Sequence, residues 1–264
     1  MTLELSRREI ADDLGKMTSA PILKRAPFYM TRKPHRALAV APASLPAAAY
    51  DFDCRRCARL ASFLDTVRGD HPGYFCHPVP PFGDGDARLV IVGLAPGKHG
   101  ANATGRPFTG DYAGVLLYGT LFDFGFGSEP ESLGAGDALR LVDARITNAV
   151  KCLPPGNKPL PAEIRECNAY LAAELSTLPE GAAVLALGRI AHDAVLRALE
   201  VPSRGHAFAH GASHALDRGV RLFDSYHCSR YNTNTRRLTA AMFKRVFRDI
   251  ARHLNRERTR ARTA

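Results

Sequence analysis

The clearest pattern along the chain is an alternation of short apolar runs with longer segments that are apolar on one side only. The apolar runs predict buried strands at residues 88–92, 142–149, 182–187 and 220–223. The longer segments around them predict helices at residues 55–68, 112–125, 161–178, 189–199 and 235–254. Strands that alternate with helices predict an α/β fold, in which right-handed crossovers join a four-stranded parallel sheet.

The two ends of the chain lack this alternation. Residues 1–50 mix Pro, Ala and basic residues, and apart from a short helix predicted over residues 6–17 they indicate a partly irregular extension. Residues 51–255 hold all the predicted strands and therefore predict one domain. Residues 256–264 are rich in Arg and predict a basic tail, which is either a frayed end or an arm that binds phosphate.

A glycine-rich loop follows the first predicted strand. Glycine permits positive φ angles and lets another molecule approach the backbone closely, and it recurs here at Gly93, Gly97, Gly100, Gly105 and Gly110. Ligands of open α/β sheets bind at the carboxyl ends of strands, where this loop begins. The loop carries one aromatic residue, Phe108, and one carboxylate, Asp111. Its spacing matches neither the dinucleotide-binding fingerprint nor the phosphate-binding P-loop, so it predicts a site for a flat ligand.

Charge adds a candidate partner. The chain has 36 Lys and Arg against 26 Asp and Glu, a formal net charge of +10. Such an excess favours nucleic acid, although a solvated basic surface is the simpler alternative. No apolar run approaches the ~18–20 residues that span a membrane, so no membrane partner is expected. Because the first residues carry charges and no apolar stretch typical of a secretory signal, we expect a cytoplasmic protein.

Six cysteines in that compartment favour metal binding or catalysis over disulfides. Cys54 and Cys57 form a C-x-x-C pair, Cys152 follows the second predicted strand, and Cys167 lies on the next predicted helix. The long gap between the pairs argues against a small zinc knuckle, but it is compatible with a cluster that joins distant segments of the chain. Spacing alone leaves open whether these residues bind a metal or cluster, or are ordinary half-buried cysteines.

Five motifs, in this order, resemble those of the family-5, broad-specificity uracil-DNA glycosylases. They are Gly-Leu-Ala-Pro-Gly from residue 93, Gly-Arg-Pro-Phe-Thr-Gly-Asp from 105, Thr-Asn-Ala-Val-Lys-Cys-Leu-Pro-Pro-Gly-Asn-Lys-Pro from 147, Leu-Gly-Arg-Ile-Ala from 187, and Tyr-His-Cys-Ser-Arg-Tyr-Asn from 226. The resemblance spans about residues 51–255. It implies a three-layer α/β/α fold with a central four-stranded parallel sheet, and a [4Fe–4S] cluster on Cys54, Cys57, Cys152 and Cys167. The family has Pro or Val where this chain has Cys228.

The resemblance also implies which residues catalyse the reaction. Breaking a glycosidic bond leaves positive charge on the sugar and negative charge on the departing base, so a donor is needed at the base and a carboxylate or positioned water at the sugar. His227 suits the donor, and Asp111 suits the carboxylate unless it merely caps the helix that follows. Asn157 matches a position linked to holding the attacking water, with a turn residue as its alternative.

Binding residues follow in the same way. Phe108 offers a face on which a flipped base stacks, unless it is packed in the core, and Asn148 offers a donor and an acceptor to the uracil edge. Backbone groups around Gly93, Leu94 and Ala95 complete the base site. The residues expected to contact DNA are Arg189, Ser229, Arg230 and Tyr231, and further cations such as Arg106 and Lys158 are candidate phosphate contacts.

The resulting expectation is a monofunctional DNA glycosylase that hydrolyses the N-glycosidic bond of uracil, and of other deaminated or damaged bases, to start base excision repair. Its partner would be double-stranded DNA, and a monomer is expected because one site serves one lesion. A non-catalytic iron–sulfur module that binds nucleic acid is the alternative. A nucleotide-dependent enzyme is disfavoured, because the loop lacks the Lys-Ser/Thr that follows phosphate-binding glycines.

Overall fold

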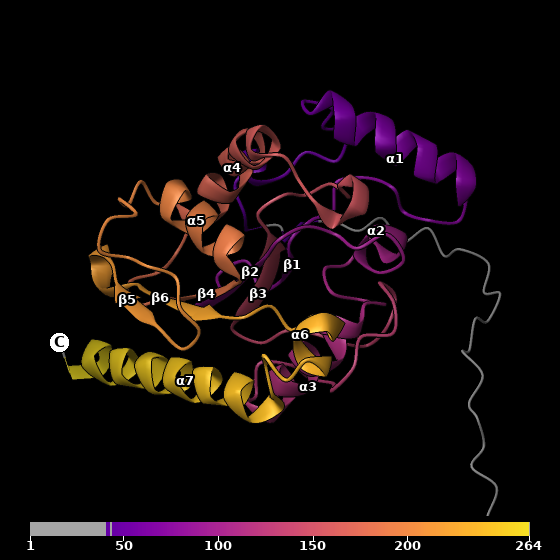
Figure 1. The fold of residues 1–264 in the computed structure, drawn as a ribbon. Coiled ribbons are helices and arrows are strands. Elements are labelled where there is room, and N and C mark those ends of the chain that lie inside the picture. The colour runs from indigo at the N-terminus through magenta and orange to yellow at the C-terminus, as the bar shows by residue number, and fades with distance from the viewer. Residues whose placement is uncertain (1–40, 43, 264) are drawn as a thin grey trace, which may run out of the picture. The chain divides into compact units, whose positions relative to one another are not determined.

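The computed structural model describes residues 41–42 and 44–263, so the helix predicted over residues 6–17 and most of the N-terminal extension lie outside the described residues. The strands form one six-stranded sheet in the order β1-β3-β2-β4-β6-β5 (Figure 1). Their bounds are β1 Phe82–Gly83, β2 Leu89–Gly93, β3 Ala144–Asn148, β4 Ala183–Leu187, β5 Ser213–Ala215 and β6 Arg221–Ser225.

The four inner strands are parallel and match the four predicted apolar runs. Leu89 of β2 pairs with Ala144 of β3 and Ala183 of β4, and β4 in turn pairs in parallel with β6. The predicted sheet was too small, because β1 and β5 extend it at its two edges by antiparallel pairing. These edge strands have two and three residues, which is too short for an apolar run or an alternation to reveal them.

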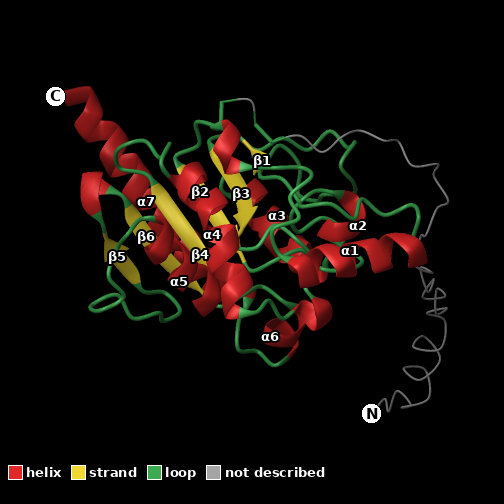
Figure 2. Cartoon of the chain, turned by 90° about the horizontal axis from the view of Figure 1, so that it is seen from above, coloured by secondary structure: helices red, strands yellow, loops and turns green. Residues whose placement is uncertain are grey.

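Helices cover both faces of this sheet, which gives three layers (Figure 2). Helices α3 (Tyr112–Asp123) and α7 (Ala240–Thr263) pack on one face, with a core around Leu117, Phe243 and Phe247. Helices α4 (Pro161–Leu175) and α5 (Arg189–Ala198) pack on the other face. Helix α1 (Ala58–Asp70) contributes to a third, smaller core with the 149–153 segment and α4.

Several boundaries differ from the sequence prediction. Helix α1 begins at Ala58, after both cysteines of the C-x-x-C pair, and α7 continues to Thr263 through the segment predicted as a tail. Arg and Glu are good helix formers, which explains how a polar extension continues the helix. Two short helices, α2 (Ala101–Thr104) and α6 (Arg230–Asn234), lie in segments predicted as loops. None of the described helices combines the length and the apolar character needed to cross a bilayer.

Candidate functional site

A pocket of about 510 Å³ opens where the parallel strands end. The loop after β2, the end of β3 and the segment after β6 all contribute to its wall. Most of the residues predicted from the sequence line it: Leu94, Ala95, Phe108, Asp111, Asn148, Asn157, His227, Ser229 and Arg230. The structure therefore brings together side chains that are up to 136 positions apart, from Leu94 to Arg230 (230 − 94). Tyr112, beside Asp111, also lines the pocket and was missed.

Gly93 ends β2 beneath this pocket. A Cβ atom at this position would lie 2.5 Å from the Asn148 side-chain oxygen and 2.7 Å from the Phe108 ring. Both contacts are closer than real side chains allow, so only glycine lets the amide and the ring approach the strand end together. Phe108 itself has a φ of 58°, an uncommon backbone conformation for a bulky residue. Its ring is packed as well as pocket-lining, since it is only 7% exposed.

Asp111 lies against the glycines of the same loop. A Cβ on Gly97 would come 2.6 Å from the Asp111 carboxylate, and one on Gly100 would overlap it. Although Asp111 immediately precedes α3, its side chain makes no capping hydrogen bond to that helix. It accepts a hydrogen bond of 3.3 Å from the Ala101 N–H instead. The capping alternative is therefore wrong for α3, and the carboxylate is available to the pocket.

Burial changes the proton affinity of both titratable groups in the pocket. It raises the pKa of Asp111 from its ordinary value, although the hydrogen bond from Ala101 opposes this shift. It lowers the pKa of His227 to about 4, because the cationic imidazole is the form that loses hydration. His227 is consequently neutral at neutral pH and can donate one N–H. Its ring stacks with that of Phe108, with 5.8 Å between the centroids.

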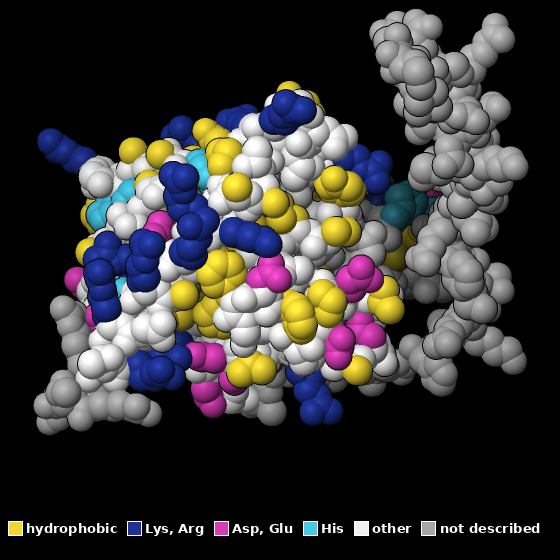
Figure 3. Space-filling view, turned by 90° about the horizontal axis from the view of Figure 1, so that it is seen from below, with side chains coloured by type: hydrophobic (Ala, Val, Ile, Leu, Met, Phe, Trp, Pro, Cys, Tyr) yellow, Lys and Arg dark blue, Asp and Glu magenta, His cyan; other side chains and the backbone are white. Residues whose placement is uncertain are grey.

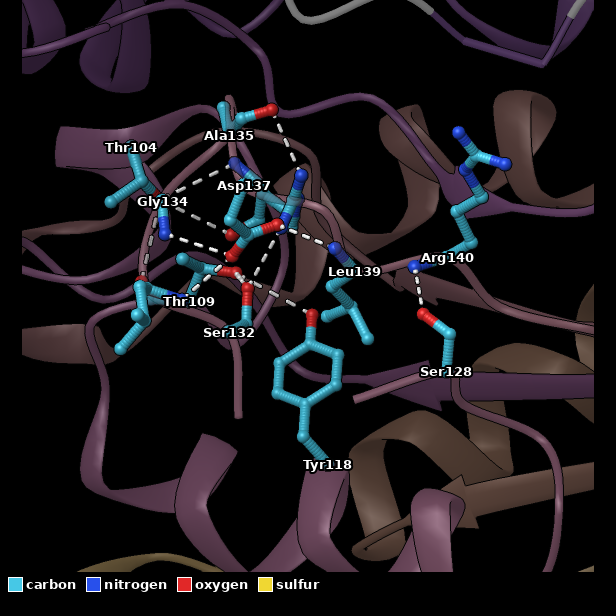
Figure 4. Close-up of polar contacts among 12 residues, drawn as sticks. Thr104, Thr109, Tyr118, Ser128, Ser132, Gly134, Ala135, Asp137, Leu139 and Arg140 are labelled. Atoms are coloured by element: carbon cyan, nitrogen blue, oxygen red, sulfur yellow. Dashed lines mark hydrogen bonds and ion pairs between the residues drawn. The ribbon is translucent and has the colours of Figure 1, made fainter. Parts of the chain in front are cut away.

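Arg106 is not a phosphate contact, contrary to the sequence prediction. It is 5% exposed and forms an ion pair of 2.5 Å with Asp137, while its guanidinium also donates to Ser132 and to the Ala135 carbonyl. Figure 4 shows Asp137, Ser132, Thr109 and Tyr118 pointing toward one another in this network. The network joins the Phe108 loop to the 129–140 segment and so fixes the wall of the pocket.

The predicted DNA contacts fall into two groups. Arg230 lines the pocket and lies over the Tyr112 ring, 5.0 Å from its centroid. Ser229 lines it too, and its hydroxyl caps α6 by accepting from the Asn232 N–H. Tyr231 lies outside the lining and is 71% exposed. Arg189 is the first residue of α5, and its side chain is exposed. The residue before it, Gly188, lies beside His227.

The four predicted cysteine ligands line a second pocket. Cys54 and Cys57 precede α1, Cys152 follows β3, and Cys167 lies on α4. The other two cysteines are packed elsewhere: Cys76 accepts a hydrogen bond from Asn102, and Cys228 lies in the core between the sheet and α7. None of the six cysteines, all of which are among the described residues, forms a disulfide. The four cysteines to which the resemblance assigns a cluster therefore line one pocket, and the other two lie outside its lining.

The chemistry of this second pocket fits a group that contains metal cations. Burial and the neighbouring thiols raise the pKa of Cys152, so four thiolates here would repel one another without a compensating positive charge. The Lys151 backbone N–H donates to the Cys167 sulfur at 3.3 Å, a contact that stabilises a thiolate. Burial and a hydrogen bond with Cys54 raise the pKa of Tyr170, whose ring also lines the pocket.

An ion pair joins α1 to α4 next to the loop that follows β3. Arg59 of α1 binds both carboxylate oxygens of Glu163 on α4, at 2.8 and 2.7 Å. The same guanidinium donates to the Lys158 carbonyl, next to the pocket residue Asn157. Because Cys152 and Asn157 belong to one loop that begins at Asn148, the cysteine pocket and the larger pocket share a single stretch of backbone. Arg59 was not predicted to have a role, because its partner is 104 positions away in the sequence.

Comparisons with known proteins agree with these motifs. The family model of the uracil DNA glycosylase superfamily matches residues 80–251. A type-5 uracil-DNA glycosylase of Thermus thermophilus is 47% identical over 204 residues, which cover 75% of this chain and 93% of that protein. A type-5 uracil-DNA glycosylase of Pyrobaculum aerophilum is 42% identical over 203 residues, with 75% and 88% covered. A type-4 uracil-DNA glycosylase of Archaeoglobus fulgidus is 31% identical over 153 residues, with 56% and 69% covered. Matches of this extent show that the chain belongs to the uracil-DNA glycosylase superfamily and, within it, to the type-5 family.

Proposed function

We propose that the protein removes uracil and other deaminated bases from double-stranded DNA by hydrolysing the N-glycosidic bond in the larger pocket. Its relatives are named uracil-DNA glycosylases. The observation that carries the proposal is the meeting of Asp111, Asn148 and His227 in one pocket at the carboxyl ends of parallel strands. No observation favours the non-catalytic alternative, and a monomer suffices because one pocket serves one lesion.

Base recognition is assigned to Phe108 and Asn148. A flipped pyrimidine stacks on the Phe108 ring, and the Asn148 amide, 3% exposed at the end of β3, reads the base edge as donor and acceptor. Backbone groups of Gly93, Leu94 and Ala95 border the same space. A pocket of about 510 Å³ also has room for a purine, which supports a range of bases wider than uracil.

Bond cleavage is divided between two sides of the pocket. The neutral His227 imidazole donates an N–H to the oxygen of the departing base, where negative charge develops. The Asp111 carboxylate stabilises the positive charge that develops on the sugar. The Asn157 side chain holds the attacking water. Water is the nucleophile, because the described residues that line this pocket include no Lys to form a Schiff base.

The DNA follows a surface that begins at α6. Arg230 and the exposed Tyr231 lie where a side chain entering the minor groove can fill the space left by the flipped base. Arg189, at the start of α5, supplies a phosphate contact. Figure 3 shows Lys and Arg side chains gathered on the half of this face that α7 occupies. Exposed cations such as Arg189 and Arg230 supply the affinity for phosphates that does not depend on sequence.

Release of free base tests the proposal directly. A duplex with one uracil opposite guanine should yield free uracil and a strand that breaks only after alkali treatment, because hydrolysis leaves an abasic site. The matched duplex with thymine in the same place should stay intact. Duplexes with hypoxanthine or xanthine test the wider base range. A protein that binds the uracil duplex without releasing base would refute the assignment.

Cys54, Cys57, Cys152 and Cys167 would hold a [4Fe–4S] cluster in the second pocket. When bound, such a cluster would cross-link the segment before α1, the loop after β3 and helix α4, and it could exchange an electron. The Lys151 N–H and the buried Tyr170 hydroxyl supply polar groups beside the thiolates. The loop that carries Asn148 and Asn157 would then be anchored at Cys152 between them.

We expect the purified protein to be brown and to contain about four iron atoms per chain, as four-thiolate ligation of this cluster requires. Cys167→Ser should lose most of the iron and the visible absorbance, because Cys167 is a ligand on the rigid helix α4. Cys76→Ser and Cys228→Ser are the matched controls and should keep the iron. A colourless protein with a single zinc ion in this pocket would contradict the expectation.

A further inference from the structure

Three metal-ligating side chains meet on the opposite side of β6 from α7, outside both pockets described above. His192 lies on α5, His214 on the edge strand β5, and Asp224 on β6. Asp224 points to the α5 face of the sheet, because it alternates with Phe223, which faces the α7 core. Within the described residues, these side chains form the one group of three potential ligands whose donor atoms all lie within 4.8 Å of one another.

The hydrogen bonds of His192 determine where its proton lies. Its Nε2 is 2.8 Å from the His206 carbonyl oxygen, which can only accept, so Nε2 carries a hydrogen. Its Nδ1 is 2.7 Å from one oxygen of Asp224, and the other oxygen is 3.1 Å from Nε2 of His214. A neutral His192 with its hydrogen on Nε2 would therefore direct the lone pair of Nδ1 at a carboxylate oxygen.

That arrangement requires a positive charge between the imidazole and the carboxylate. His192 is 1% exposed and Asp224 is fully buried, so water does not supply the compensation. Two candidates remain: a second proton on the imidazole, or a metal ion. Both neutralise the buried carboxylate, but they make different demands on the atoms around it.

The surrounding atoms favour the metal ion. Metal-ligating histidines commonly donate the other ring N–H to a backbone carbonyl, as His192 does to His206. Two imidazoles and one carboxylate are a ligand set typical of zinc, with a fourth position left for water. The His214 side chain is 12% exposed, so the group is open to solvent on that side. Tetrahedral bonds of about 2.0–2.1 Å place two ligand atoms roughly 3.3 Å apart, so the 2.7 Å contact between His192 Nδ1 and Asp224 would lengthen by about 0.6 Å on zinc binding.

We propose that His192, His214 and Asp224 form a binding site for a divalent transition-metal ion of the Zn²⁺ class. The ion would join α5 to the last two strands of the sheet, and Asp224 precedes His227 by three residues on the segment that leads into the larger pocket. A metal bound only by the folded chain would stabilise that end of the sheet.

Zinc titration tests the proposal on the protein with its native iron content. After chelation with a metal buffer and dialysis against Zn²⁺, we expect one zinc per chain in addition to the iron, and a higher melting temperature. Asp224→Asn and His214→Gln should each weaken zinc binding by more than about 10²-fold, since even changes behind the ligands weaken metal binding by 10–100-fold. His214→Gln changes a partly exposed residue of an edge strand, so it remains informative if Asp224→Asn does not fold.

His253→Gln is the control for non-specific binding to histidine. This residue lies on α7, where its ring contacts the Ala182 carbonyl at 3.3 Å, and the variant should bind zinc like the parent. Cobalt in place of zinc separates this site from the cysteine pocket, because nitrogen and oxygen ligands give none of the intense charge-transfer absorption of cobalt thiolates. No zinc beyond the cysteine pocket, or zinc binding unchanged in His214→Gln, would overturn the proposal and assign the charge to a proton on His192.

Discussion

His227→Ala is expected to lower the single-turnover rate of uracil release by roughly 10²–10³-fold, the effect of removing one preorganised donor from a developing anion. The imidazole lines the pocket beside Phe108 and is neutral, because burial lowers its pKa to about 4. The variant should bind undamaged duplex as the parent does, since phosphate contacts supply that affinity. Rapid-quench measurement on a uracil duplex gives the rate, and filter binding gives the affinity.

The pH dependence follows from the same burial. Above a pKa of about 4 His227 is neutral, so its titration should not change the rate between pH 6 and pH 8. Only as the pH falls toward 4 does the imidazole become cationic. His253→Ala, a histidine on α7 outside the pocket, is the matched control and should keep the parent rate. An active His227→Ala variant would show that backbone groups alone stabilise the departing base.

Asp111→Asn is expected to lower the same rate by about 10²-fold, within the range for a positioned carboxylate, while the melting temperature stays unchanged. The amide keeps the size of the carboxylate in the space left by Gly97 and Gly100, and its oxygen can still accept from the Ala101 N–H. Stability is preserved because the Asp111 side chain makes no cap hydrogen bond to α3. Only the negative charge that we propose to act on the sugar is lost.

The pH profile provides a second measurement. Burial raises the pKa of Asp111, so the ionised form is lost at a higher pH than for an ordinary aspartate as the solution is acidified. The parent rate should fall through that step, and Asp111→Asn should lack it. Ser128→Ala, on the 128–140 segment outside the pocket, serves as a control for general effects of substitution. An Asp111→Asn variant as fast as the parent would refute the role of the carboxylate and leave the sugar side of the reaction to the water that Asn157 is proposed to hold.

The central sheet and the residues of the larger pocket could be predicted from the sequence for a physical reason. Strands buried on both faces, such as β2 and β4, appear as unbroken apolar runs, and functional side chains of parallel sheets gather at the carboxyl ends. The edge strands β1 and β5 were missed because they are short and partly exposed. A strand buried on both faces leaves a recognisable apolar run in the sequence, whereas pairing at the edge of a sheet leaves no such pattern.

Partners distant in sequence account for the other errors. Arg106 was predicted to contact phosphate because a charge in a loop gives no sign of Asp137, the residue that buries it 31 positions away. Asp111 could be assigned to a cap or to the pocket only once its distance to Gly97 and Gly100 was known. The trio of His192, His214 and Asp224 has no motif at all, since each member comes from a different element.

The loop shared by the two pockets limits how this enzyme can vary. Within the ten residues 148–157, Asn148 lines the larger pocket, Cys152 lines the cysteine pocket, and Asn157 lines the larger pocket again. Inserting or deleting a residue on either side of Cys152 would move one of these groups out of place. Natural variants should therefore differ here by substitution and not by length, and redesign of base preference should keep the spacing and change the side chains around it.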